Sequence, residues 1–325
     1  MKHILFFLSL LSFSYYADAK TYNYTEYHTM IAKAENALTK EDFKTSLQIY
    51  KKAFEEYPFK FACDIYHAIQ VALILKSDID CKNLLDTCFA YGIPLKCLHN
   101  APLIHVYLEP KPKNEIDRQI IFFNKLYEAR IDIKLQNEWK ERFNCEQAAK
   151  RINDKNESYM VCLKDNYEAL KKYISTNKYF PGEKIMGICS DNSAGSYIGD
   201  NCGLSNEIVT PTVLHTGISF ADLKMYLDMS LENGSLNPRD YMYMLEFEKG
   251  TGKEQTGFKK YYNAHQQNID FSCYSLCFNM GWGNGCNDNV LANECRKKIG
   301  VCSVETDQLK NAIKKKYGFV FLNIM

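Results

Sequence analysis

The chain has 325 residues, and its 40 Lys and Arg residues nearly balance its 39 Asp and Glu residues. This balance provides no electrostatic field that would attract nucleic acid or an anionic membrane, so neither is expected as a partner. The sequence contains 13 cysteines, an odd number, so at least one thiol is expected to stay unpaired.

Residues 1–19 have the three parts of a secretory signal peptide. A basic start at Lys2 precedes an apolar run from Ile4 to Tyr16, and Ala17-Asp18-Ala19 forms a small-x-small cleavage site. The run is too short to cross a bilayer, and no later stretch approaches the roughly 18 apolar residues of a membrane helix. The alternatives are an N-terminal anchor or the first helix of the fold. We expect an exported protein of the periplasm, cell surface or medium, with no transmembrane segment after cleavage.

Residues 20–109 are expected to form helical hairpins. In the first hairpin, apolar spacing of three and four residues predicts one helix from Tyr24 and a second that stops at Pro58. Thr39 and Asp42 have the form of a capping box, in which Thr39 would cap the second helix. This hairpin resembles a tetratricopeptide repeat. Ala34, Ser46, Tyr50, Ala53 and Pro58 lie in that register, and Met30 replaces the large aromatic residue expected early in the first helix.

A second helical pair is expected over residues 61–75 and 79–90, without the signature of the repeat. After it, the charged segment Glu109-Pro110-Lys111-Pro112 interrupts helix twice. We therefore end the tetratricopeptide-like region at residue 109 and expect connecting helices over 110–144.

An α-rich domain is expected over residues 145–325. Within it, a helix is predicted to end at Gly234, and Asn237 is expected to cap the next helix with Pro238 at its first position. The segment Phe319-Val320-Phe321-Leu322 is the only convincing strand-like run. The predicted fold class is mostly α, with repeat-like hairpins, an irregular α-rich domain and minor β-structure at the C-terminus.

The one candidate for chemistry is His215. It is expected in a loop four residues before a helix N-terminus, whose positive end lowers the pKa of a nearby imidazole. A neutral His215 there could act as a general base. The alternative is a ring whose nitrogens tie the loop to backbone groups. The carboxylates that could orient the ring are those of Glu183, Asp222, Asp240 and Glu246.

Cysteines are densest in the loop 273–302. Their spacing does not match the paired C-x2-C knuckles of zinc sites, and no His lies among them. We expect disulfides there, because an exported chain meets an oxidising compartment; buried thiols and a metal site are the alternatives. The candidate disulfide cysteines are Cys189, Cys202, Cys273, Cys277, Cys286, Cys295 and Cys302. No cofactor and no metal site are predicted.

Several short motifs follow one another in this part of the chain. They are Asp165-Asn166 with Leu170, Phe180-Pro181-Gly182-Glu183-Lys184, His215, Gly234-x-Leu236-x-Pro238 with Tyr241, and Arg296-Lys297-Lys298-Ile299-Gly300 with Ser303. With them, the region from Cys145 to Met325 resembles an uncharacterised helical domain of exported bacterial proteins. Relatives often have a run of His near the position of His215, where this chain has one. The family has no established activity, so the resemblance implies a helical fold and no reaction.

Together these features favour an exported protein-interaction or scaffold protein over an enzyme. The expected partner is a protein or a small ligand of the cell envelope. The repeat-like helices and a site in the second domain are expected to bind it. One alternative is a hydrolase-like enzyme with His215 as general base, although no nucleophile stands out. Another is a disulfide-rich secreted protein with a structural role.

Overall fold

The structure is a computed structural model that describes residues 22–152, 157–188, 209, 220–242 and 289–321. Within these ranges the chain is helical and contains no strand, which confirms the predicted mostly-α class. None of the helices described there is long and apolar enough to cross a membrane. The leader and His215 lie outside the described residues.

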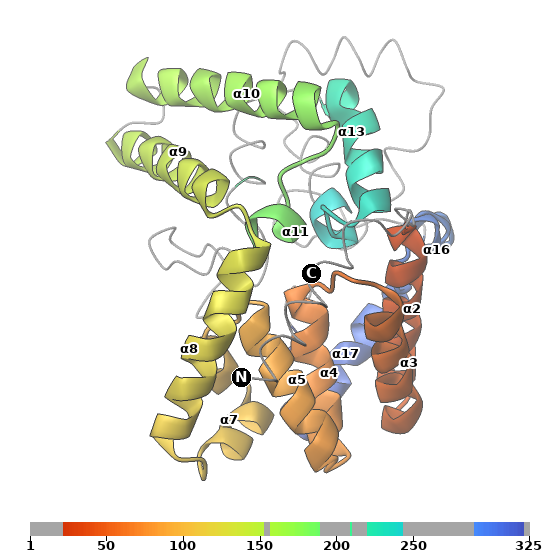
Figure 1. Cartoon of the computed structure of the whole chain (residues 1–325). Helices are drawn as coiled ribbons and strands as arrows, with labels where there is room; N and C mark the ends of the chain where they lie inside the picture. Colours follow the sequence, from red (N-terminus) through yellow and green to blue (C-terminus); the bar gives the residue numbers. More distant parts are fainter. Residues whose placement is uncertain (1–21, 153–156, 189–208, 210–219, 243–288, 322–325) are drawn as a thin grey trace, which may run out of the picture.

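Helices α2 to α5 form two hairpins at the N-terminal end (Figure 1). Helix α2 (Tyr24–Thr39) packs against α3 (Phe43–Glu56), and α4 (Ala62–Ile74) packs against α5 (Asp78–Ala90). The first pair lies close together because Ala34 is fully buried and its carbonyl oxygen accepts a hydrogen bond of 2.9 Å from the Ser46 hydroxyl. Helical pairs therefore form where the sequence predicts them, and their assignment to the tetratricopeptide repeat stays a prediction.

The turn between α2 and α3 differs from the predicted capping box. Asp42 is the residue that caps α3, since its side chain accepts a bond of 3.2 Å from the backbone N–H of Thr45. Thr39 is instead the last residue of α2, and its hydroxyl donates to the carbonyl of Asn36 at 3.0 Å. Glu41 adopts a φ of 62° between the helices, so the chain completes its turn before α3 begins.

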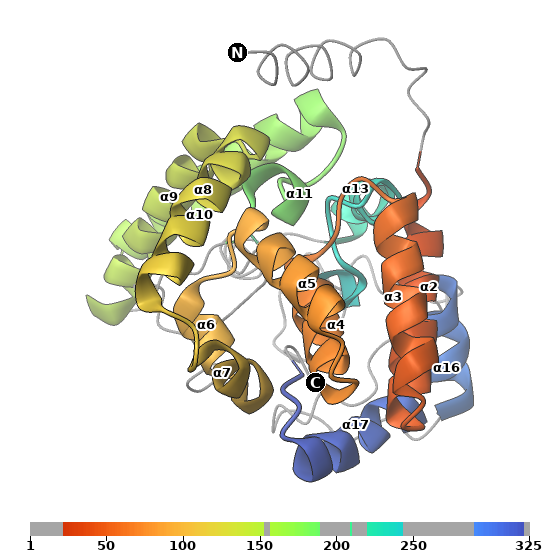
Figure 2. The same ribbon diagram turned by 60° about the horizontal axis from the view of Figure 1, so that its bottom comes forward.

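The remaining helices continue from this bundle and return to it. Helix α8 lies beside α5, the pair α9 and α10 lies across the top of Figure 1, and α17 packs against α2 (Figures 1 and 2). Their bounds are α6 (Leu95–His99), α7 (Pro102–Leu108), α8 (Lys113–Arg130), α9 (Ile133–Ile152), α10 (Glu157–Asn177), α11 (Glu183–Met186), α13 (Phe220–Asn233), α16 (Asn289–Lys298) and α17 (Val304–Tyr317).

Buried apolar side chains form two main clusters. The first contains the inner faces of α2 to α5 together with Ile313 of α17 and the phenyl rings of Phe319 and Phe321. The second surrounds Trp139 and Leu170 and joins α9 and α10 to α13 and α16. Because the last helix belongs to the first cluster, the C-terminal segment completes the core of the N-terminal helices.

The C-terminal run predicted as a strand is not one. The N–H of Val320 donates to Oε1 of Gln70 at 2.7 Å, and its carbonyl accepts from Nε2 of the same side chain at 2.9 Å. On either side, the rings of Phe319 and Phe321 pack against the imidazole of His67. The run is apolar because it fills the core beside α4, and one side-chain amide takes the place of a neighbouring strand.

Candidate functional site

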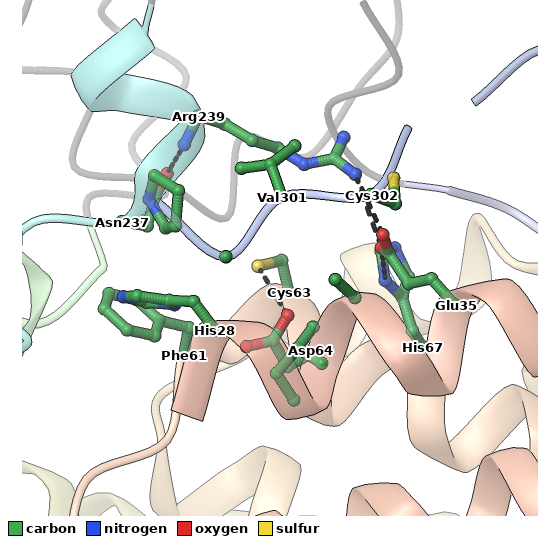
Figure 3. A pocket seen from close by; sticks show the side chains of 14 residues that line it. His28, Glu35, Phe61, Cys63, Asp64, His67, Asn237, Arg239, Val301 and Cys302 are labelled. Carbon is green, nitrogen blue, oxygen red and sulfur yellow. Dashed lines mark hydrogen bonds and ion pairs between the residues drawn. The ribbon is translucent and has the colours of Figure 1, made fainter. Parts of the chain in front are cut away.

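Segments from distant parts of the chain enclose a cavity of about 40 Å³ at the first turns of α4 (Figure 3). A cavity of this size can hold a few water molecules. Helices α2 and α4 form one side, and residues 237–239 and 300–302 form the other. The lining residues are His28, Ile31, Ala32, Glu35, Phe61, Cys63, Asp64, His67, Asn237, Pro238, Arg239, Gly300, Val301 and Cys302.

Two local features place residues 237–239 and 300–302 against helices α2 and α4. Gly300 has a φ of +74°, and a Cβ atom at this position would lie 2.6 Å from Cβ of His28, so only glycine lets this turn lie against α2. Asn237 caps the next helical turn as predicted, because its Oδ1 accepts bonds from the backbone N–H groups of Arg239 and Asp240 at 2.9 and 2.8 Å. The preceding helix ends at Gly234, also as predicted.

A cluster of five charged side chains lies beside the cavity, and two of its members, Glu35 and Arg239, line it. Nζ of Lys310 lies 2.8 Å from Oε2 of Glu35 and 2.6 Å from Oδ1 of Asp307. Nη2 of Arg239 lies 3.3 Å from Oε1 of Glu35, and Nη1 of Arg296 lies 2.7 Å from Oδ2 of Asp307. The cluster joins α2 to three C-terminal segments, because Glu35 faces two of the cations and Asp307 faces all three.

Both carboxylates in this cluster stay ionised. Burial by itself would raise the pKa of Glu35, but the charges of Lys310 and Arg239 outweigh it and lower the pKa to about 2. Burial would also raise the pKa of Asp307, but the charges of Lys310, Arg239 and Arg296 hold it well below its usual range. Within the cluster, three cations therefore face two anions at neutral pH.

Glu35, Cys302 and Asp307 have the spacing of a metal site, since one ligand atom of each lies within 4.8 Å of the others. However, Nζ of Lys310 lies 2.8 Å from Glu35, 2.6 Å from Asp307 and 3.4 Å from Sγ of Cys302. Its ammonium group already supplies the positive charge at the centre of the three, and burial raises the pKa of the Cys302 thiol. These residues do not fit a metal ion.

Two buried histidines border the cavity in their neutral form. Burial lowers the pKa of both His28 and His67 to about 3, and for His67 the nearby charge of Glu35 opposes this shift without overcoming it. Nε2 of His28 is buried and has no hydrogen-bond partner. A buried polar atom without a partner costs about 1–3 kcal/mol, so His28 favours a ligand that can bond to it.

Asp64 provides a carboxyl group that titrates near neutrality. Burial is the main cause that raises its pKa to about 7, and the negative charge of Glu35 adds to it. The Tyr27 hydroxyl donates to its Oδ2 at 2.9 Å, and the Cys63 thiol donates to its Oδ1 at 3.5 Å. The wall of the cavity next to Cys63 therefore changes charge close to pH 7.

Glu183, a predicted site residue, is buried beneath the N-terminus of α4. Its Oε1 accepts a bond of 2.7 Å from the backbone N–H of Ala62, whereas its Oε2 has no partner. Burial raises its pKa to about 8, with smaller contributions from the charges of Asp64 and Asp240. Glu183 is therefore protonated at neutral pH, which does not suit a carboxylate that orients an imidazole.

The other predicted site residues are only partly described. Asp240 belongs to the helix start at Asn237, whose Nδ2 donates to Oδ2 of Asp240 at 2.6 Å. Asp222 lies within α13, but its side chain is outside the described part, as are His215 and Glu246. The general base proposed for the hydrolase alternative therefore stays a prediction.

The prediction that Cys302 forms a disulfide is wrong. Cys302 has a free thiol, which donates to Oδ1 of Asp307 at 3.1 Å and accepts from Lys310. It belongs to the charged cluster because the turn after Gly300 directs it toward α2. Cys295 is buried in the second apolar cluster. Cys189, Cys202, Cys273, Cys277 and Cys286 lie outside the described residues.

Comparison with known proteins does not identify this site. No family model, no curated protein and no solved structure gives a significant match to the chain.

Proposed function

We propose that this chain is an exported binding protein whose cavity holds a small ligand with a single carboxylate group. The observation that carries the proposal is made at His28, which lines the cavity and whose buried Nε2 atom has no hydrogen-bond partner. Because neutral imidazole can donate or accept at this nitrogen, a polar ligand in the cavity would remove the cost of leaving it unpaired. Export rests on the predicted leader.

Arg239 supports an anionic ligand. Its side chain extends across the cavity toward Glu35 in Figure 3, and it is 16% exposed, whereas the side chains of Lys310 and Arg296 are 0% and 2% exposed. Of the three cations in the cluster, Arg239 is therefore the one that reaches the cavity. The planar guanidinium group matches the geometry of a carboxylate.

The surroundings favour one negative charge over two. Glu35 is ionised and lines the same cavity as Arg239, so its charge would repel a dianion such as hydrogen phosphate more strongly than a carboxylate. Ile31, Phe61 and Val301 add apolar surface to the lining, which suits the carbon part of a small organic acid.

The proposal can be tested by filling the cavity. Ala32 lines it and is half-buried, so Ala32→Leu would occupy the space without removing a charged group. Ala37→Leu is the matched control, because Ala37 is half-buried on the same helix and does not line the cavity. Acetate should raise the melting temperature of the wild type and of Ala37→Leu, since a ligand that binds only the folded state stabilises it.

The comparison needs a salt control, because chloride at equal ionic strength screens the same charges. Stabilisation by acetate that exceeds that by chloride and disappears in Ala32→Leu supports the proposal. Equal effects of acetate and chloride, or an acetate effect that survives in Ala32→Leu, would contradict it. Stronger stabilisation by phosphate than by acetate would contradict the assigned ligand class.

A further inference from the structure

Two imidazole rings face each other on the surface, away from the cavity. Nδ1 of His99 lies 3.0 Å from Nδ1 of His105, and the ring centroids are 5.1 Å apart at an angle of 69°. Both residues are exposed. The charged cluster and the cavity do not involve this pair.

The chain holds the two rings in place through buried neighbours. His99 is the last residue of α6, and His105 lies one turn into α7, which Pro102 begins. Leu98 and Ile104, each next to one of the histidines, are fully buried in the first apolar cluster. The rings are therefore positioned by the packing of two short helices that contact each other.

The separation of the two nitrogens fits two ligands of one metal ion. With metal–nitrogen bonds of about 2.0–2.1 Å, two imidazoles at angles between roughly 90° and 110° place their nitrogens about 2.8–3.4 Å apart. The 3.0 Å between His99 and His105 lies within this interval. In the neutral pair, one Nδ1 donates its proton to the other; when a metal binds, that proton moves to Nε2 of the same ring and both Nδ1 lone pairs become ligands.

We propose that His99 and His105 form a two-ligand site for a divalent transition-metal ion of the Zn²⁺ and Cu²⁺ class. Imidazole ligands select these ions over Mg²⁺ and Ca²⁺, which prefer oxygen. Among the described residues, no third His, Cys, Asp or Glu completes a cluster with the pair. In the proposed site, water fills the positions that the two imidazoles leave, and the ion stays open to an additional ligand.

The site also differs physically from the group of Glu35, Cys302 and Asp307. There a buried ammonium group lies between the candidate ligands, whereas His99 and His105 share only a hydrogen bond that a metal ion can replace. The surface pair can therefore accept a cation that the buried group excludes.

The test is a titration of the purified protein, freed of metal by a chelator, with Zn²⁺ as the probe. Zn²⁺ does not oxidise thiols, and imidazole ¹⁵N resonances report on each histidine separately. The resonances of His99 and His105 should move together and saturate together. His99→Gln and His105→Gln should each weaken binding at the remaining histidine on the order of a hundred-fold, because the two-ligand effect is lost.

Lys96→Gln provides the matched control, since Lys96 is exposed on α6 and carries no metal-binding imidazole. It should leave the Zn²⁺ response of both rings unchanged. The proposal is overturned if neither resonance moves while Zn²⁺ binds to cysteines, or if each ring responds equally well in the absence of the other.

Discussion

Nζ of Lys310 lies 2.8 Å from Oε2 of Glu35, although the two residues are 275 positions apart in the sequence. Both side chains are buried, and Asp307 contacts the same ammonium group at 2.6 Å. This contact ties α17 to α2, and it holds the C-terminal segments against the cavity.

Replacing Lys310 should therefore be strongly destabilising. Lys310→Met leaves Glu35 and Asp307 buried with one fewer cation, and breaking a buried ion pair typically costs about 3–5 kcal/mol. Urea unfolding monitored by circular dichroism would measure the change. The control is Lys316→Met on the same helix, because Lys316 contacts Glu41 at an exposed site where ion pairs contribute little. Equal effects of the two substitutions would contradict a stabilising role for the buried cluster.

Glu183 should make stability fall as pH rises. In the unfolded chain its carboxyl group ionises near 4.5, whereas the folded protein keeps the proton up to about pH 8. Between these values the unfolded state binds fewer protons, so the free energy of unfolding decreases by a few kcal/mol at most. Glu183→Gln removes this contribution, and its stability relative to wild type should rise between pH 5 and pH 8. Glu168→Gln, at an exposed position, serves as the control. A constant difference across this range would show that Glu183 is ionised in the folded protein.

Substitution by alanine should destabilise the protein more at Gly300 than at Gly318. Both have positive φ, of +74° and +68°, so alanine is strained at either position. At Gly300 the added Cβ would also lie 2.6 Å from the backbone nitrogen of Thr29, whereas at Gly318 the nearest atom is Cβ of Pro102 at 3.6 Å. Gly318→Ala should cost about 1 kcal/mol, and Gly300→Ala should cost clearly more and perturb His28. Similar losses would mean that the turn does not contact α2 closely.

Gln70 should fix the C-terminal segment. Gln70→Leu removes both hydrogen bonds to the backbone of Val320 and leaves that N–H and carbonyl without them. Amide exchange at Val320 should become faster by at least ten-fold, which corresponds to about 1.4 kcal/mol of lost local protection. Gln48→Leu, at an exposed position on α3, should leave this exchange rate unchanged. An unaltered rate in Gln70→Leu would argue that the phenyl rings alone hold the segment.

Local patterns predicted the helices and some of their ends. The spacing of apolar residues located the hairpins, and Asn237 and Gly234 marked a helix start and a helix end. Thr39 was wrong as a cap because residues 40 and 41 form a turn before Asp42, and a capping-box pattern alone does not specify that turn.

Local sequence patterns do not predict the cavity, because its residues come from distant parts of the chain. Glu35 and Asp64 are charged positions on helical faces that otherwise bury apolar side chains, and this is a signal that sequence reading can detect. Their partners Arg239, Asp307 and Lys310 come from the other end of the chain, and no local pattern connects residues at such separations. The apolar run at Phe319 likewise does not indicate that the side chain of Gln70, and not a neighbouring strand, pairs with its backbone.

The most direct test of the proposed binding function is the imidazole ¹⁵N resonance of His28 during titration with acetate at constant ionic strength. If a carboxylate occupies the cavity, Nε2 of His28 gains a hydrogen-bond partner, and its resonance should shift and saturate in the wild type and in Ala37→Leu but not in Ala32→Leu. A His28 resonance that stays fixed while acetate is added to the wild type would contradict the proposal.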